Sequence, residues 1–274
     1  MRIRLSHTTT YRYDVPPTAV TQILRLTPRN HDSQYVMNWR IDLSEDSELH
    51  QHEDAFGNIT HSFTATGPFT ELSVLVEGQV DTQDTDGVVT GTIERFPPAL
   101  FLRETSLTEA DSAIVDFAEA TRAAGGGDTL SMLHALVREV HREVAYDEDP
   151  THTATTAAEA FKLHRGVCQD MAHIYIAAAR RLGVPARYVS GHLCRTDTVA
   201  QEAGHAWAEA YVDQLGWVGF DPANAVCTTD AHVRVAVGLD YLSAAPIRGT
   251  RYGGRGETMT VAVHVAQARQ QAQT

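Results

Sequence analysis

The spacing of apolar residues changes once along this chain, near Phe96-Pro97-Pro98, and this change limits the possible folds more than any other feature. Before it, short segments alternate apolar and polar residues, which is the period of a β-strand with one buried face. Turn-forming residues separate these segments. We expect strands at residues 2–13, 23–26, 37–43, 59–65, 72–80 and 88–93. A series of short strands with regular turns predicts an all-β, sandwich-like domain.

After Pro98, apolar residues recur at every third or fourth position, which is the period of an amphipathic helix. The pattern predicts helices over residues 108–121, 129–144 and 167–182. Strands are expected to follow at residues 186–192, 205–212, 216–220 and 261–265, with a glycine-rich loop at 248–255. Helices followed by an antiparallel sheet are typical of an α+β domain. We therefore divide the chain into a β-rich domain, residues 1–103, and an α+β domain, residues 104–274.

Composition excludes several classes of protein. The 274 residues, of which 43% are hydrophobic, are enough for one large or two small globular domains. The net charge of −13 argues against sequence-independent binding to nucleic acid, whose phosphates would repel it. No apolar run approaches the roughly 20 residues that span a bilayer, and no secretory signal is visible, so we expect no membrane association. Three cysteines are too few for a disulfide framework and favour a cytoplasmic location.

Cys168 opens the expected helix at 167–182, two residues after Gly166. Unpaired backbone N–H groups and the positive end of the helix dipole lie at such a position. They lower the pKa of a thiol, which makes it a better nucleophile, and they can stabilise an oxyanion. Because most cysteines are inert and buried, position alone makes Cys168 a candidate and no more. Cys194 and Cys227 have no comparable setting.

His205 and Asp221 lie near opposite ends of an expected hairpin that turns at residues 213–216. A thiolate nucleophile needs an imidazole, and the imidazole needs an acid that orients it. The two side chains share one face of the sheet only if the numbers of opposed residues have an even sum, since a slip of one residue would separate them. Taken singly, His205 could be a surface residue and Asp221 a turn cap. Together with Cys168 they give a nucleophile, a base and an acid in that order.

Three segments resemble motifs of the bacterial transglutaminase-like superfamily of cysteine enzymes, and they occur in the order found in that family. Residues 164–173 resemble the nucleophile motif, residues 204–209 the histidine motif and residues 216–224 the aspartate motif. The first hundred residues, with segments 26–29 and 54–58, resemble the N-terminal β domain of bacterial members. The chain departs from the family just before His205, where the acidic residue is shifted to Glu202.

The resemblance implies a papain-like transglutaminase core, in which the nucleophile helix packs on an antiparallel sheet, preceded by the all-β domain. By the same resemblance, Cys168 would be the nucleophile, His205 the general base and then acid, and Asp221 the orienting carboxylate. The implied reaction is acyl transfer through a thioester, without a cofactor, on a peptide or amide substrate that can be a whole protein. We expect hydrolysis, as a protease or amidase. Transfer to an amine, as in a true transglutaminase, is the alternative.

Three further residues are candidates for the oxyanion hole or the acyl pocket: Gln169, Trp207 and Trp217. Gln169 follows the nucleophile, and the two tryptophans flank the proposed histidine and aspartate, although sheet packing explains them equally well.

Two other classes of function are kept open. The first is a metallohydrolase that uses His164, His173 and His192, although the chain has no HExxH or CxxC motif. The second is a binding or assembly module that keeps the fold without the activity.

Overall fold

The structure is a computed structural model that describes residues 1–195, 199–201 and 203–268. Glu202, the shifted acid, lies outside the described residues. Alternating residues form the expected strands because every second side chain is buried, as in β1 (Arg2–Val15) and β6 (Glu71–Thr82). The other strands of this part are β2 (Ala19–Thr27), β3 (Gln34–Leu43), β4 (His50–Glu53) and β5 (Ile59–Thr66). The strand expected at residues 88–93 is only β7 (Val88–Val89), and it pairs with β13 (Gly216–Asp221) outside the β domain.

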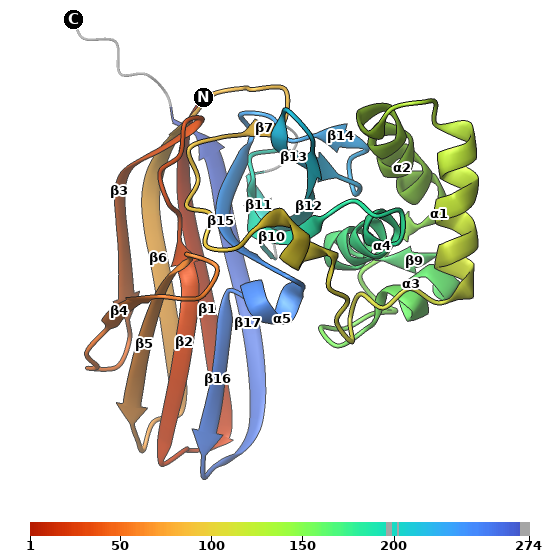
Figure 1. Cartoon of the computed structure of the whole chain (residues 1–274). Coiled ribbons are helices and arrows are strands. Elements are labelled where there is room, and N and C mark those ends of the chain that lie inside the picture. Colours follow the sequence, from red (N-terminus) through yellow and green to blue (C-terminus); the bar gives the residue numbers. More distant parts are fainter. Residues whose placement is uncertain (196–198, 202, 269–274) are drawn as a thin grey trace, which may run out of the picture.

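Two antiparallel sheets enclose the core of the β domain (Figure 1). One sheet has the strand order β11-β17-β1-β6-β3, and the other has the order β16-β2-β5-β4, in which β11 is Ala200–Gln201, β16 is Ile247–Tyr252 and β17 is Arg255–Gln267. Their inner faces meet in one cluster, which includes Leu24 and Phe63 from one sheet and Leu72 and Val74 from the other. The N-terminal β domain expected from the sequence is therefore present.

The last two long strands of the chain belong to these same sheets. β16 (Ile247–Tyr252) pairs with β2, and β17 (Arg255–Gln267) pairs with β1. The expectation of a loop at residues 248–255 was wrong, because only the turn at Gly253 and Gly254, which have positive φ, is irregular. The chain leaves these two sheets after β6, touches one of them again at Ala200–Gln201 and rejoins both from residue 247, whereas residues 104–274 were expected to form a single domain.

The helices follow the apolar spacing closely. They are α1 (Ser112–Ala124), α2 (Thr129–Glu143), α3 (Ala157–Leu163), α4 (Cys168–Arg181) and α5 (Tyr241–Ala244), after the 3-10 helix η1 (Pro98–Leu102). Helix α1 begins later than expected because the side chain of Asp111 caps it by accepting from the Ile114 N–H. In the described part of the chain, no helix is both long and apolar enough to cross a membrane.

A third sheet lies between the helices and the β domain (Figure 1). Its order is β14-β13-β12-β10-β15, formed by β10 (Ala186–Leu193), β12 (His205–Val212), β13 (Gly216–Asp221), β14 (Val226–Cys227) and β15 (His232–Gly238). Alanines 206, 208 and 210 of β12 share a core with α4. The alternate residues, Trp207 and Glu209, therefore face the β domain. Short pairs complete the fold: β8 (Ala145–Tyr146) with β9 (Arg165–Gly166), and β11 (Ala200–Gln201) with β17.

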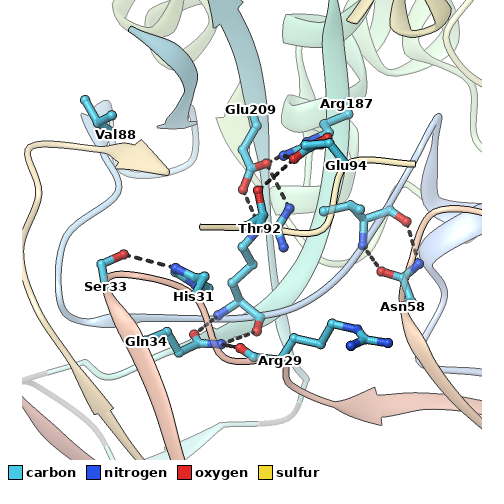
Figure 2. A network of polar contacts seen from close by, with 12 residues as sticks. Arg29, His31, Ser33, Gln34, Asn58, Val88, Thr92, Glu94, Arg187 and Glu209 are labelled. Atoms are coloured by element: carbon cyan, nitrogen blue, oxygen red, sulfur yellow. Dashed lines mark hydrogen bonds and ion pairs between the residues drawn. The ribbon is translucent and has the colours of Figure 1, made fainter. Parts of the chain in front are cut away.

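A buried ionic network joins the third sheet to the β domain and to the linker, which is the segment between β6 and α1 (Figure 2). The fully buried carboxylate of Glu209 accepts from Nε of Arg187 and from Nε of Arg234, each at 2.7 Å. Arg187 also pairs with Glu94 of the linker at 2.8 Å, and its guanidinium lies 3.9 Å from the centre of the Trp217 ring. Burial would raise the pKa of Glu209, but the two arginines lower it to about 2. The network thus holds the third sheet against its neighbours.

Candidate active site

Cys168 is the first residue of α4 and is half-buried. The carboxylate of Asp170 fixes the preceding turn, because it accepts from the Val167 N–H at 2.9 Å and from the Thr151 hydroxyl at 2.8 Å. Gly166 is required in this turn, since a Cβ there would lie only 2.7 Å from the Asp170 carboxylate. The thiol is therefore held at a helix N-terminus, where backbone N–H groups are free to meet a negative charge.

His205 and Asp221 come together through the register of the β12–β13 hairpin. Ala208 lies opposite Phe220, an even sum, so Asp221 falls opposite Trp207 and on the same face as His205. His205 and Asp221 therefore lie on the same face of the sheet, as the candidate site requires. Nε2 of His205 lies 2.7 Å from Oδ2 of Asp221, and the carboxylate is fully buried.

The thiol of Cys168 and the carboxylate of Asp221 act on the same imidazole. Burial would lower the pKa of His205, but the charge and hydrogen bond of Asp221, with a hydrogen bond and charge from Cys168, raise it to about 10. Because Nε2 faces Asp221, Nδ1 is the nitrogen left for the thiol. Burial would also raise the pKa of Asp221, but the two histidines that it contacts hold it well below its usual range.

His232, at the start of β15, is a fourth member of this cluster that sequence reasoning missed. Its Nε2 lies 3.1 Å from Oδ2 of Asp221. The amide of Asn224 donates to the same oxygen at 2.7 Å. Asn224 lay within the aspartate motif and could have been noticed there. No spacing pattern marks His232, because it lies outside the hairpin on a strand that pairs with β10.

The hydrogen bonds of His232 also bear on metal binding. The ligand atoms of His205, Asp221 and His232 lie within 4.8 Å of one another, as a metal site would require. However, Nδ1 of His232 accepts from the Thr229 N–H at 3.1 Å, so its proton is on Nε2. Metal-binding histidines normally bind through one nitrogen and donate from the other. His232 therefore fits a hydrogen-bonded cluster and does not fit a metal site.

The three histidines considered earlier as metal ligands are not grouped in the described part of the chain. His173 is fully buried and accepts from the Tyr241 N–H at 3.0 Å. Nδ1 of His164 lies 3.1 Å from the Glu143 carbonyl oxygen. His192 is buried in ring contact with His7. The histidines of the metallohydrolase hypothesis thus lie in three separate settings.

The three candidate pocket residues have different positions. Trp207 is buried beside the cluster, with its ring edge-on to His232 at 5.3 Å and 6.1 Å from the ring of His205. Trp217 packs against Arg187 in the ionic network instead, because it lies further along β13 from Asp221. The amide of Gln169 donates to the Thr153 carbonyl at 3.4 Å. Of the three, Trp207 alone contacts the cluster.

Tyr146 flanks the thiol and was not singled out from the sequence. It lies opposite Gly166 in the parallel β8–β9 pair, and 57% of its surface is exposed. Desolvation of its hydroxyl and the nearby charges of Cys168 and Glu148 raise its pKa to about 12. A largely exposed tyrosine therefore lies near the nucleophile.

Comparison with protein families agrees with this arrangement. Residues 116–222 match the model of the transglutaminase-like superfamily. Residues 3–81 match the model of the bacterial transglutaminase-like N-terminal region. The first match contains Cys168, His205 and Asp221, but it ends before His232.

Individual relatives cover different parts of the chain. An uncharacterized protein of Mycobacterium leprae is 31% identical over 272 residues, which cover 94% of this chain and 95% of that protein. A protein-glutamine gamma-glutamyltransferase of Pseudomonas aeruginosa is 29% identical over 159 residues, which cover 48% of this chain and 23% of that protein. A solved structure from Cytophaga hutchinsonii, described as a putative cysteine protease, covers 100% of this chain and 92% of its own, with a TM-score of 0.78 and 21% identity. It shows that the two chains share a fold.

Proposed function

Because this chain belongs to the transglutaminase-like superfamily, we propose that it is a cysteine-dependent enzyme that transfers acyl groups from amide bonds through a thioester. One observation carries the proposal: the buried Asp221 carboxylate, 2.7 Å from His205, makes that imidazole basic beside the thiol of Cys168. An imidazolium held between a carboxylate and a thiol keeps the sulfur as a thiolate.

In the first half of the reaction, the sulfur of Cys168 attacks the carbonyl carbon of the amide. The carbonyl oxygen becomes an oxyanion, which the backbone N–H groups at the start of α4 stabilise. The C–N bond then breaks, and His205 gives its proton to the departing amine. The products of this half are a thioester on Cys168 and a free amine.

In the second half, the acceptor loses a proton to His205 as it attacks the thioester. The C–S bond breaks, and the thiolate of Cys168 is restored beside the imidazolium. Asp221 keeps the ring of His205 oriented throughout, and the buried ring of Trp207 packs 6.1 Å from it.

Water is the acceptor that we propose, because Cys168 is half-buried and flanked by the exposed Tyr146, which leaves a thioester open to solvent. The substrate would then be a peptide or another amide, and the enzyme a protease or amidase. The alternative acceptor is an amine. It is supported by the similarity of about half of the chain to a protein-glutamine gamma-glutamyltransferase.

One experiment separates the two acceptors. A peptide digest of casein is incubated with the full chain in ¹⁸O-labelled water, with and without a fluorescent primary amine, and the products are read by mass spectrometry. Hydrolysis places ¹⁸O in a new carboxylate, whereas transglutamination places the amine on glutamine. Both products should disappear in Cys168→Ala. If Cys168→Ala and the wild type give the same products, and iodoacetamide modifies Cys168 no faster than Cys194 and Cys227, the protein is a binding module and the proposal is wrong.

A further inference from the structure

We infer that His232 is a positioning residue, which holds the Asp221 carboxylate in place behind His205, and that the β domain in turn holds His232. The inference rests on the proposed function, because it assigns a role around the same cysteine. It also gives the β domain a task in the reaction, although that domain supplies no residue to the cluster of Cys168, His205 and Asp221.

Three side chains contact one oxygen of the Asp221 carboxylate. Its Oδ2 is contacted by His205 at 2.7 Å, by Asn224 at 2.7 Å and by His232 at 3.1 Å. A buried carboxylate needs such donors, since an unpaired charge is costly away from water. Several donors on one oxygen also stop the carboxylate from rotating and presenting its other oxygen to His205.

The position of the proton on His232 determines how its ring meets Asp221. The Thr229 N–H donates to Nδ1, so His232 can meet Asp221 only as a donor from Nε2. In this state it holds the carboxylate without competing for the proton of His205. The roles of the two histidines on Asp221 are therefore different, even though both use Nε2.

His232 has little freedom to leave this position. It is buried, and the edge of Trp207 contacts its ring at 5.3 Å. A cavity of about 30 Å³ lies on the side of the β domain, lined in part by His232, Trp207, His31 and Gln34. Burial and the contact with Trp207 therefore hold the ring of His232 in place.

One cross-strand pair of the β domain forms hydrogen bonds to the backbone on both sides of His232. Gln34 and Thr82 lie opposite each other in β3 and β6. The Thr82 hydroxyl donates to the carbonyl of Asp230 at 2.5 Å. The Gln34 amide donates to the carbonyl of Arg234 at 2.9 Å and accepts from its N–H at 2.8 Å. The backbone is thus fixed two residues before and two residues after His232.

The test uses two substitutions, each of which keeps one of the two hydrogen bonds of the imidazole. The amide of glutamine can reach the position of Nε2, so His232→Gln keeps a donor to Asp221. The shorter His232→Asn keeps an acceptor near Nδ1 for the Thr229 N–H but cannot reach Asp221. The readout is the rate of Cys168 alkylation by iodoacetamide from about pH 4 to about pH 9, located by mass spectrometry on the full chain. The titratable groups around the cluster are Cys168, His205, Asp221, His232 and His192, with Tyr146 and Tyr188 near the thiol.

We expect the acid limb of the alkylation profile to lie about one pH unit higher in His232→Asn, so that alkylation at a pH on that limb is about ten-fold slower, as for the loss of one hydrogen bond to a charge. His232→Gln should stay within about three-fold of the wild type. Equal rates in His232→Asn and the wild type would overturn the inference. So would an equal loss in both variants when thermal melting shows that both are folded.

The design also separates this inference from the proposed function. The rate of alkylation needs no amide substrate. If His205→Ala leaves the profile of Cys168 unchanged, the proposed function fails and the inference fails with it. If the profile depends on His205 but not on His232, the inference alone fails.

Discussion

At the scale of single residues, the site depends on the charge of one buried carboxylate. Burial would lower the pKa of His205, but Asp221, with a smaller contribution from Cys168, raises it to about 10. The imidazole beside the thiol of Cys168 is therefore protonated across the neutral range. The effect needs the negative charge of Asp221 as well as its hydrogen bond.

Removing that charge should convert Cys168 into an ordinary thiol. In Asp221→Asn the pKa of His205 falls, so we expect alkylation near pH 7 to slow by about ten-fold and to rise steadily toward alkaline pH. Mass-spectrometric labelling across pH gives the profile. Asn224→Ala, which removes a donor and keeps the charge, is the control and should change the rate less. A profile in Asp221→Asn like that of the wild type would contradict the role of the charge.

At the scale of secondary-structure elements, the start of α4 decides where the thiol lies. The turn before α4 is closed by the Asp170 carboxylate, which leaves no space for a side chain on Gly166. The element therefore depends on a close approach between two residues that flank the nucleophile.

A methyl group at this point should move the turn. In Gly166→Ala the new Cβ would meet the Asp170 carboxylate at 2.7 Å, so we expect a loss of about 1–3 kcal/mol in the free energy of unfolding. Alkylation of Cys168 should slow as well. Gly127→Ala is a matched control, because no atom lies within 4 Å of its Cβ and its φ is ordinary. Urea unfolding measures both variants, and equal stability in the two would contradict the argument.

At the scale of the whole molecule, buried neutral histidines link stability to pH. Burial lowers the pKa of His7 and of His173 to about 4, and holds that of His192 well below its ordinary value of 6.5. Below about pH 6.5 the unfolded chain takes up protons that the folded chain refuses. The resulting stability is complete above that pH and is lost as the pH falls toward 4.

We therefore expect the free energy of unfolding to fall by a few kcal/mol between about pH 6.5 and about pH 4. Urea titrations at a series of pH values measure it. Replacing His7 and His192 together by glutamine removes two of these groups and should flatten the dependence. His205 acts with the opposite sign, because its raised pKa contributes stability that is lost as the pH rises from 6.5 toward 10. A curve that is flat below pH 6.5 would contradict this account.

The grip of the β domain on residues 230–234 gives a second prediction at this scale. Gln34→Leu removes both hydrogen bonds to Arg234, so we expect slower alkylation of Cys168 by about three-fold or more, although Gln34 lies outside the cluster. Gln51→Leu, an exposed position on β4, is the control. The same labelling experiment compares the two variants. An unchanged rate in Gln34→Leu would mean that the two units are joined without influence on the site.

Local spacing carries much of the fold and the hairpin half of the site. Alternation and three- to four-residue periods were enough to place most strands of the β domain and helices α1, α2 and α4. An element that buries one face repeats its apolar residues every two to four positions, and this repeat is visible within a short segment. Local spacing also placed the hairpin that carries His205 and Asp221, but the register that puts both on one face came from the structure. Helix α3 was missed because it is only seven residues long.

What the sequence by itself determined is therefore local: the two kinds of structure, the helix that begins at Cys168 and the motifs of the transglutaminase-like family. What only the tertiary structure decided depends on residues that are far apart in the chain. Strand β16 pairs with β2, so a glycine-rich segment became a strand once it had a partner. His232 contacts Asp221, and Gln34 contacts Arg234, because β15 pairs with β10 in the third sheet and also lies against the β domain. Contacts of this kind leave no period in the sequence, since they depend on how separate elements pack against one another.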